Sequence, residues 1–251
     1  MVEVSPRHVL CVLGSGLDLS EVERVASGFG GFVLDREYSE SEPDPRMPEA
    51  FEACMAAASF DDADWAAVES HDTVAYLLSM PMMREMAADT SRRLLAATAA
   101  LLESGATAVK NESSGIAHGR ERWLALAERA SGAEAEDLAD ALITAWVKRP
   151  ISDGKVLYSC GMHLLGAPDV EIEAEASQLT RDELADLVVH LDTLAIYLLT
   201  DPRAEEIEDG AGFRLTEDSP RWVLRTGACD RYDEDDFFYN PYGYVRLTRH
   251  G

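Results

Sequence analysis

The sequence predicts an α+β protein built from two sequential strand-and-helix layers. Two features lead to this fold class. Short apolar runs of strand length end at glycine or proline, and between them apolar residues recur at the three- and four-residue steps of one-sided helices. Because both kinds of element must cover their apolar faces, we expect layered sheets flanked by helices, with ferredoxin-like halves packed sheet to sheet as one arrangement.

The first sixty residues contain two strands and two helices. Residues 8–14 (HVLCVLG) and 31–36 (GFVLDR) are apolar runs typical of strands. Between them, Asp18 and Glu21 have the spacing of a capping box, which predicts a helix that the following glycines end. A polar, proline-broken loop comes next, and we expect helix to resume over residues 49–58.

The next fifty residues complete the first layer. Residues 73–80 (TVAYLLSM) predict a buried strand, residues 83–104 a long amphipathic helix, and residues 106–110 a short strand. With one inserted helix, the resulting order is that of the βαββαβ, ferredoxin-like unit. We therefore predict an N-terminal ferredoxin-like half over residues 1–131.

The middle of the chain predicts a helix and a hairpin. Residues 113–130 are interpreted as a helix that begins at a serine. Residues 142–147 and 155–159 are interpreted as two strands joined by a turn at residues 150–154. Residues 169–174 (DVEIEA) alternate carboxylates with apolar side chains, which predicts a strand with one wet face.

The rest of the chain predicts one helix and a strand-rich tail. Thr180 and Glu183 form a second capping box, and apolar residues continue at helical spacing as far as Leu198. The tail offers three further strands, at residues 211–216, 221–226 and 243–247. These elements define a predicted C-terminal strand-rich half over residues 132–251.

The charge balance restricts the classes of partner. Asp and Glu number 47 against 22 Lys and Arg, giving a formal net charge of -25 at pH 7. Such a surface repels nucleic-acid phosphates and anionic lipid headgroups, and no basic cluster reverses the field locally. We therefore predict neither nucleic-acid nor membrane binding, and expect any protein partner to present a basic or an apolar patch.

The cysteines and the N-terminal residues indicate a cytoplasmic protein. The four cysteines are far apart and include no CxxC pair, which is typical of reduced thiols. The N-terminal sequence MVEVSPRHVLCVLGSG has a single arginine and an apolar run too short for a signal peptide or an anchor.

Two stretches resemble a known family: LLESGATAVKNESSGIAHGRERW, and LITAWVKRP followed by SCGMHLLGAPDVEIEA. They are similar to the bacterial domain-of-unknown-function family 4261 over about residues 95–250. The family motif, Gly-(two residues)-Phe-Gly-(two residues)-Glu-Ile-Glu, would correspond here to Gly161, Leu165, Gly166, Glu171, Ile172 and Glu173. Leu165 replaces the Phe, and the spacing before the acidic strand departs from that of the motif. Since the family has no established activity, the resemblance implies an architecture and a cellular setting but no catalytic residues.

One group of candidate site residues lies around the predicted acidic strand. A thiol, an imidazole and carboxylates occur together as Cys160, His163, Glu171 and Glu173, and these groups could bind Zn²⁺ or form a nucleophile pair. The alternative is a buried cysteine, a turn histidine and two glutamates that face solvent on the same side of the strand. Because the ligand pairs of a structural zinc site are missing, we predict no metal, no cofactor and no catalytic residue.

A second group lies where a predicted strand meets a predicted helix. Asn111, Glu112, Ser113, Ser114 and His118 are gathered there, and the free N–H groups of a helix start can bind an anion. Helix capping explains the serines without any ligand. Ligand binding by Asn111, Ser113 and His118 therefore remains one of two interpretations.

Three further motifs are weaker. Residues 14–16 (GSG) follow a strand but lack the third glycine and the acidic partner of a dinucleotide site. Residues 230–236 (DRYDEDD) could attract Ca²⁺ but lack the EF-hand glycine and terminal glutamate, which favours a solvated loop. The aromatic side chains beyond it could anchor a partner or cover a sheet: Phe237, Phe238, Tyr239, Tyr242 and Tyr244.

These observations favour a non-enzymatic binding or interaction module, of the stress-response or toxin-immunity type. Negative charge is what an immunity protein offers to a basic enzyme, so the net charge fits this interpretation. The alternative is an enzyme or small-ligand binder with a pocket between the two halves, using some of the candidate residues named above. An enzyme should bring several of those side chains into one concave pocket.

Overall fold

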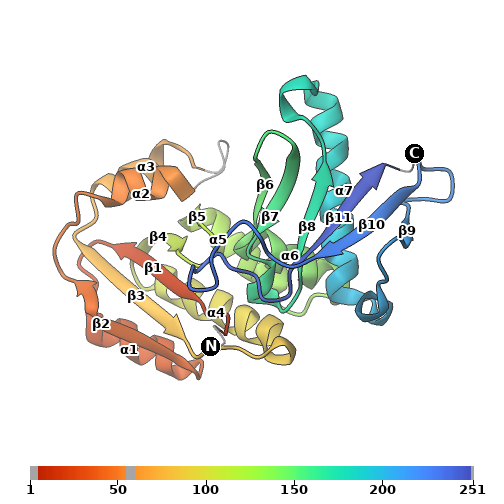
Figure 1. Ribbon diagram of the computed structural model, residues 1–251. Helices are drawn as coiled ribbons and strands as arrows, with labels where there is room; N and C mark the ends of the chain where they lie inside the picture. The colour runs from red at the N-terminus through yellow and green to blue at the C-terminus, as the bar shows by residue number, and fades with distance from the viewer. Residues whose placement is uncertain (1–4, 55–59, 250–251) are drawn as a thin grey trace.

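The computed structural model describes residues 5–54 and 60–249 of the protein. The fold is α+β, with two sheets (Figure 1). The N-terminal sheet has the strand order β2-β3-β1-β4-β5, and all its neighbouring strands are antiparallel. Its strands are β1 (Val9–Gly14), β2 (Phe32–Glu40), β3 (Thr73–Ser79), β4 (Ala106–Asn111) and β5 (Ile116–Gly119).

Helices cover both faces of the N-terminal sheet, because its central strand is apolar on both sides. In β1, Leu10 and Val12 contact one apolar cluster, and Cys11 and Leu13 contact the other. The first face carries α1 (Leu19–Gly28), α4 (Arg84–Glu103) and α5 (Arg120–Ala130). The second face carries the two short helices α2 (Met47–Cys54) and α3 (Asp62–Glu69), which cover only part of it (Figure 1).

The C-terminal sheet has the strand order β6-β7-β8-β11-β10-β9. Its strands are β6 (Lys148–Ser152), β7 (Val156–Cys160), β8 (Asp169–Glu173), β9 (Gly212–Phe213), β10 (Trp222–Gly227) and β11 (Tyr244–Arg249). The β8–β11 pair is parallel and the other pairs are antiparallel. The connections include α7 (Arg181–Thr200) and the 3₁₀ turns η1 (Met162–Leu165), η2 (Ala176–Gln178) and η3 (Pro202–Glu206).

The two sheets are joined through helices, which differs from the sheet-to-sheet packing expected. Helix α6 (Ala135–Trp146) packs against α5 and α7, and α4 packs against η1. One continuous apolar cluster runs from β1 through these helices to β11. Helix α6 is buried on several sides, and its residues Leu142, Ile143 and Trp146 belong to that cluster. Helices therefore fill the space between the halves.

The N-terminal half contains the predicted strands and helices in the predicted sequence, but two helices, α2 and α3, stand where one inserted helix was predicted, and an additional strand, β5, follows β4. The C-terminal half has a different order, with α6, three strands, α7 and three more strands, so it does not repeat the βαββαβ pattern. The boundary expected after residue 131 falls in the loop between α5 and α6, which pack against each other.

Two predicted elements were wrong, for the same physical reason. Residues 113–119 form a turn and strand β5, and the helix begins only at Arg120. Residues 142–147 belong to helix α6 and not to a strand, so the hairpin partner of β7 is β6. Nearly all residues of both segments are buried, so neither segment shows the solvent-facing side whose periodicity separates a strand from a helix.

The capping predictions had mixed outcomes. Thr180 and Glu183 form the predicted reciprocal capping box of α7. Asp18 caps α1, whereas Glu21 pairs with Arg24 instead of closing a box. Helix α3 was not predicted, and the predicted helix over 49–58 begins at Met47, with residues 55–58 outside the described part.

Among the described residues, no helix combines the length and the apolar character that crossing a bilayer requires.

Candidate functional site

A groove of about 600 Å³ opens between the two halves of the described chain. Its floor is the part of the N-terminal sheet that α2 and α3 leave uncovered, where Val9 and Leu78 lie opposite each other on β1 and β3. The other wall is the loop before β11, drawn in dark blue, which crosses from the C-terminal sheet toward the N-terminal one (Figure 1). We call this site the junction groove.

Four aromatic side chains line the junction groove and come from both halves of the chain. Tyr38 and Tyr76 stand on β2 and β3 with their ring centroids 6.5 Å apart, and Phe237 and Phe238 belong to the loop. Tyr38 is 63% exposed and Phe237 is 50% exposed. Exposed aromatic rings around a groove are typical of binding surfaces, since large apolar side chains are otherwise buried.

The charged groups of the junction groove are mainly acidic. Asp35, Glu112 and Asp236 line it together with one cation, Arg7. Glu112 forms an ion pair with Lys110, in which Lys110 Nζ lies 2.6 Å from Glu112 Oε1. In the described part of the chain, neither Asp35 nor Asp236 forms an ion pair; each carboxylate accepts a local backbone N–H two residues on.

A buried hydrogen-bonded network lies at the end of β4, beside this groove. His8 Nε2 bonds to Ser91 Oγ at 2.8 Å, and Asn111 Nδ2 donates to His8 Nδ1 at 3.0 Å. Asn111 Oδ1 accepts from the backbone N–H of Ser113, whose hydroxyl donates to the Arg7 carbonyl. The network ties the N-terminal segment, β4 and α4 together, so Asn111 and Ser113 have a structural role within it.

The structure lacks the helix start on which the predicted anion site at Ser113 depended. Residues 112–115 form a turn between two strands instead. His118 is buried on β5, where Nε2 contacts the Ala145 carbonyl at 3.0 Å and the ring packs edge-on against Trp123. Asn111, Ser113 and His118 are thus all buried, and none of them lines the junction groove.

Three buried histidines lie in or beside the interface between the halves. Burial and, to a smaller extent, the neighbouring His163 ring lower the pKa of His8 to about 3. Burial likewise lowers the pKa of His118 to about 3 and that of His163 to about 4. These rings are therefore neutral at pH 7.

His163 is buried in η1 without a well-formed hydrogen bond on either ring nitrogen in the described structure. The carbonyl groups of Ser113 and Phe237 favour its protonated form, which opposes the effect of burial on its pKa. Its ring therefore lies where the turn after β4, the loop before β11 (the groove loop) and η1 meet.

Gly161 is required where η1 packs on the N-terminal half. Its φ is +120°, and a Cβ there would lie 2.6 Å from the Trp146 carbonyl oxygen and 2.8 Å from Ser114 Cβ. Such distances cannot be relieved by rotating a flexible side chain, because the first contact is backbone.

We expect Gly161→Ala to lower the free energy of unfolding by about 3 kcal/mol, combining left-handed backbone strain with overpacking. Gly154→Ala is the matched control, because Gly154 has φ +94° and open space around it. That control should cost about 1 kcal/mol, from the backbone alone. Urea unfolding measures both, and equal losses would show that the contact with Trp146 and Ser114 adds nothing.

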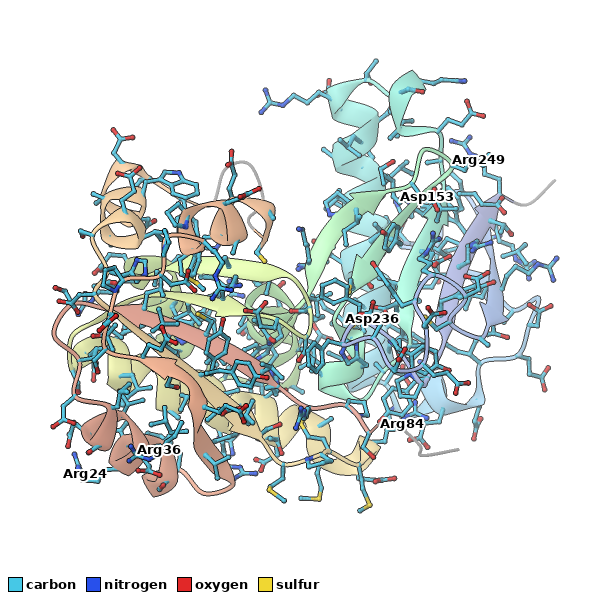
Figure 2. The ribbon with its side chains drawn as sticks, turned by 60° about the vertical axis from the view of Figure 1, so that its left-hand side comes forward. Arg24, Arg36, Arg84, Asp153, Asp236 and Arg249 are labelled. Atoms are coloured by element: carbon cyan, nitrogen blue, oxygen red, sulfur yellow. The ribbon has the colours of Figure 1, made fainter. Side chains whose placement is uncertain are left out.

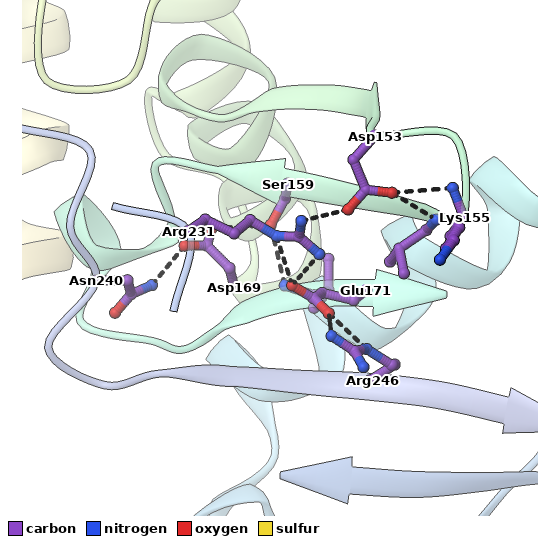
Figure 3. A network of polar contacts seen from close by, with 10 residues as sticks. Asp153, Lys155, Ser159, Asp169, Glu171, Arg231, Asn240 and Arg246 are labelled. Atoms are coloured by element: carbon purple, nitrogen blue, oxygen red, sulfur yellow. Dashed lines mark hydrogen bonds and ion pairs between the residues drawn. The ribbon is translucent and has the colours of Figure 1, made fainter. Parts of the chain in front are cut away.

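A second polar network lies in the C-terminal sheet around Asp169 and Glu171 (Figure 3). Asp169 is buried and accepts from Ser159 Oγ at 2.9 Å and from Asn240 Nδ2 at 2.8 Å. Burial raises the pKa of Asp169 to about 7, although these two donors favour the charged form. Asn240 also donates to the Ala167 carbonyl, so this network anchors the far end of the groove loop.

Glu171 is held between two arginines. Arg246 Nε donates to it at 2.6 Å and Arg231 Nε at 3.1 Å, and Arg231 also pairs with Asp153 (Figure 3). The Glu171 side chain is only 3% exposed. Of the two glutamates predicted to share a wet face, Glu173 is exposed as expected, whereas the arginines bury Glu171.

The structure does not assemble the candidate thiol–imidazole pair. Cys160 lies beside Asp169 and Tyr232, whereas His163 lies beside His8 and the groove loop, and the two side chains share no hydrogen bond among the described residues. Burial and Asp169 raise the pKa of the Cys160 thiol well above its ordinary value. Cys160 is therefore the buried, protonated cysteine of the alternative interpretation.

The acidic run 230–236 is a loop whose residues 233–236 are exposed. In the described parts of the chain, no three His, Cys, Asp or Glu side chains gather as a metal site would require. Gly14 ends β1 and residues 15–16 follow it, and the Asp72 carboxylate accepts from the Gly16 N–H at 2.6 Å.

Sequence analysis missed most of the residues that build these sites. Tyr38, Tyr76 and Asp35 carry no local motif, because they become neighbours only when β2 and β3 pair. Phe237 and Phe238 were found through the density of aromatic residues. Arg231 had a usable signal, since a single cation inside the run DRYDEDD indicates a paired side chain.

In comparisons with known proteins, no family model, no curated protein and no solved structure matches the chain.

Proposed function

We propose that the protein is a non-enzymatic binding module whose binding site is the junction groove. The observation that carries this proposal is a groove of about 600 Å³ lined by aromatic rings from both halves of the chain. Ligand sites typically have such volumes, apolar walls and a few polar groups. Of the candidate side chains of an enzyme, Asn111 and Ser113 are held in one buried network and Glu171 in another, and none of them lines the groove.

The cellular setting is also a proposal. All four cysteines are free, and burial raises the pKa of the Cys11 thiol to about 12 and also raises that of Cys54. Free thiols fit a reducing compartment, so we propose a cytoplasmic location. The resemblance to family 4261 over residues 95–250 is retained as a proposal about architecture, and a stress-response or toxin-immunity role is the kind of binding function that the acidic charge favours.

Titration with indole, which carries no charge, tests whether the groove binds an aromatic ligand. In ¹H–¹⁵N NMR titrations, we expect saturable shifts at the amides of Val9, Tyr76 and Phe237. The double variant Tyr38→Ala/Phe237→Ala should weaken this binding by about tenfold or more, because both rings contribute contact area.

Val189→Ala is the matched control, since Val189 is an equally exposed apolar side chain on α7 and does not line the groove. This variant should bind indole as the unmodified protein does. Shifts scattered over the surface, or an undiminished response in the double variant, would remove the groove as the binding site.

A further inference from the structure

We propose that the junction groove binds a basic segment of a partner protein, with an arginine or lysine side chain held against the aromatic walls. This inference rests on the proposed function and names the ligand class of the same site. It follows from three properties of the groove: unpaired carboxylates, aromatic faces and an open mouth.

The unpaired carboxylates provide the charge complementarity. Asp35 and Asp236 line the groove from opposite sides and form no ion pair with any described cation, and Figure 2 shows Asp236 between the two sheets. The chain as a whole carries a formal charge of -25, which attracts cations toward any concave acidic site. An anionic ligand would meet this field and only one lining cation, Arg7.

The aromatic walls suit a guanidinium or ammonium group in particular. Cations bind over the faces of aromatic rings, and arginine does so most often. The groove already contains one such contact, because the Arg7 guanidinium carbon lies 6.0 Å from the centroid of Phe237. A guanidinium of the partner would occupy the same kind of position while reaching Asp35 or Asp236.

The open mouth favours a protein segment over a free small molecule. Small-molecule sites bury most of their ligand, about 70–90% of its surface. Tyr38 and Phe237 are 63% and 50% exposed, so a small ligand bound against them would remain largely exposed to solvent. A partner protein brings its own surface to cover these rings, as the aromatic anchors of protein interfaces require.

A peptide series that changes only the charge of one side chain tests this inference. The probes are the blocked peptide acetyl-Gly-Leu-Arg-Leu-Gly-amide and its analogues with citrulline or glutamate in place of arginine. Citrulline keeps the shape of arginine without its charge. In NMR titrations of the whole protein, we expect the arginine peptide to bind about tenfold more tightly than the citrulline peptide, with the glutamate peptide weakest.

Charge variants of the groove should change this selectivity and leave the fold intact. Asp35→Asn and Asp236→Asn keep the oxygens that accept local N–H groups, and each should weaken only the arginine peptide, by about threefold or more. Arg7→Gln should strengthen it by a similar factor, because a competing cation is removed. Asp218→Asn, an exposed acid outside the groove, is the matched control and should change nothing.

Equal affinities for the arginine and citrulline peptides would overturn the inference while leaving a groove that binds indole in place. Agmatine is the small-molecule probe to compare with the peptides. If agmatine binds as tightly as the arginine peptide, the ligand is a free organic cation and the inference of a partner segment is wrong. Absence of both indole and peptide binding would instead remove the proposed function itself.

Discussion

Acidification from pH 7.5 to pH 5 should lower the free energy of unfolding by about 3–4 kcal/mol. The main cause is the set of three buried neutral histidines, His8, His118 and His163, whose pKa values are about 3, 3 and 4 in the folded protein and 6.5 in an unfolded chain. The unfolded chain takes up these protons as the pH falls through 6.5, and the folded protein does not. Each ring therefore costs about 2 kcal/mol at pH 5, or about 6 kcal/mol together.

Asp169 works in the opposite direction over the same pH range. Its pKa is raised from 3.8 to about 7, so the folded protein takes up a proton as the pH falls from 7.5 to 5 and the unfolded chain does not. This uptake stabilises the folded protein by about 2.5 kcal/mol at pH 5 relative to pH 7.5. The net loss of about 3–4 kcal/mol is the difference between the two effects.

Two variants separate these contributions in urea unfolding experiments at both pH values. His163→Gln removes one of the three proton uptakes, so the acid-induced loss should fall to about 1–2 kcal/mol. Asp169→Asn removes the opposing uptake, so the loss should grow to about 6 kcal/mol. If both variants keep the pH dependence of the unmodified protein, the buried histidines and Asp169 do not control acid stability.

Glu171→Gln should lower the free energy of unfolding by about 3 kcal/mol, the second large effect. Glu171 is 3% exposed between Arg231 and Arg246, which are themselves 19% and 23% exposed. Removing one partner of a buried ion pair leaves the other charges poorly solvated, which typically costs about 3–5 kcal/mol. The partial exposure of both arginines places the expected value at the low end of that range.

Glu173→Gln is the control for Glu171→Gln, because the two glutamates share strand β8 and Glu173 is exposed. It should change stability by less than about 0.5 kcal/mol. The double variant Glu171→Gln/Arg246→Gln should lose less than the sum of its single variants, since one unpaired charge is removed with its partner. Strict additivity in urea unfolding would mean that the Glu171–Arg246 pair is not coupled.

The sequence by itself determined the elements whose apolar pattern has a clear period or a local cap. Residues 8–14 and 73–80 alternate between two buried faces, and Thr180 and Glu183 cap α7 within one turn, so local chemistry was sufficient. Residues 113–119 and 142–147 were misassigned because each is buried on every side. Their secondary structure depends on what surrounds them, and that information is not local.

Only the tertiary structure decided the candidate site. Strand pairing brings Tyr38 next to Tyr76, and the loop before β11 carries Phe237 and Asp236 across to the uncovered face of the N-terminal sheet. The same folding buries Glu171 between two arginines while leaving Glu173 in water. Residue type and spacing could name the chemical groups, but the long-range contacts determine which groups meet and which carboxylates stay unpaired.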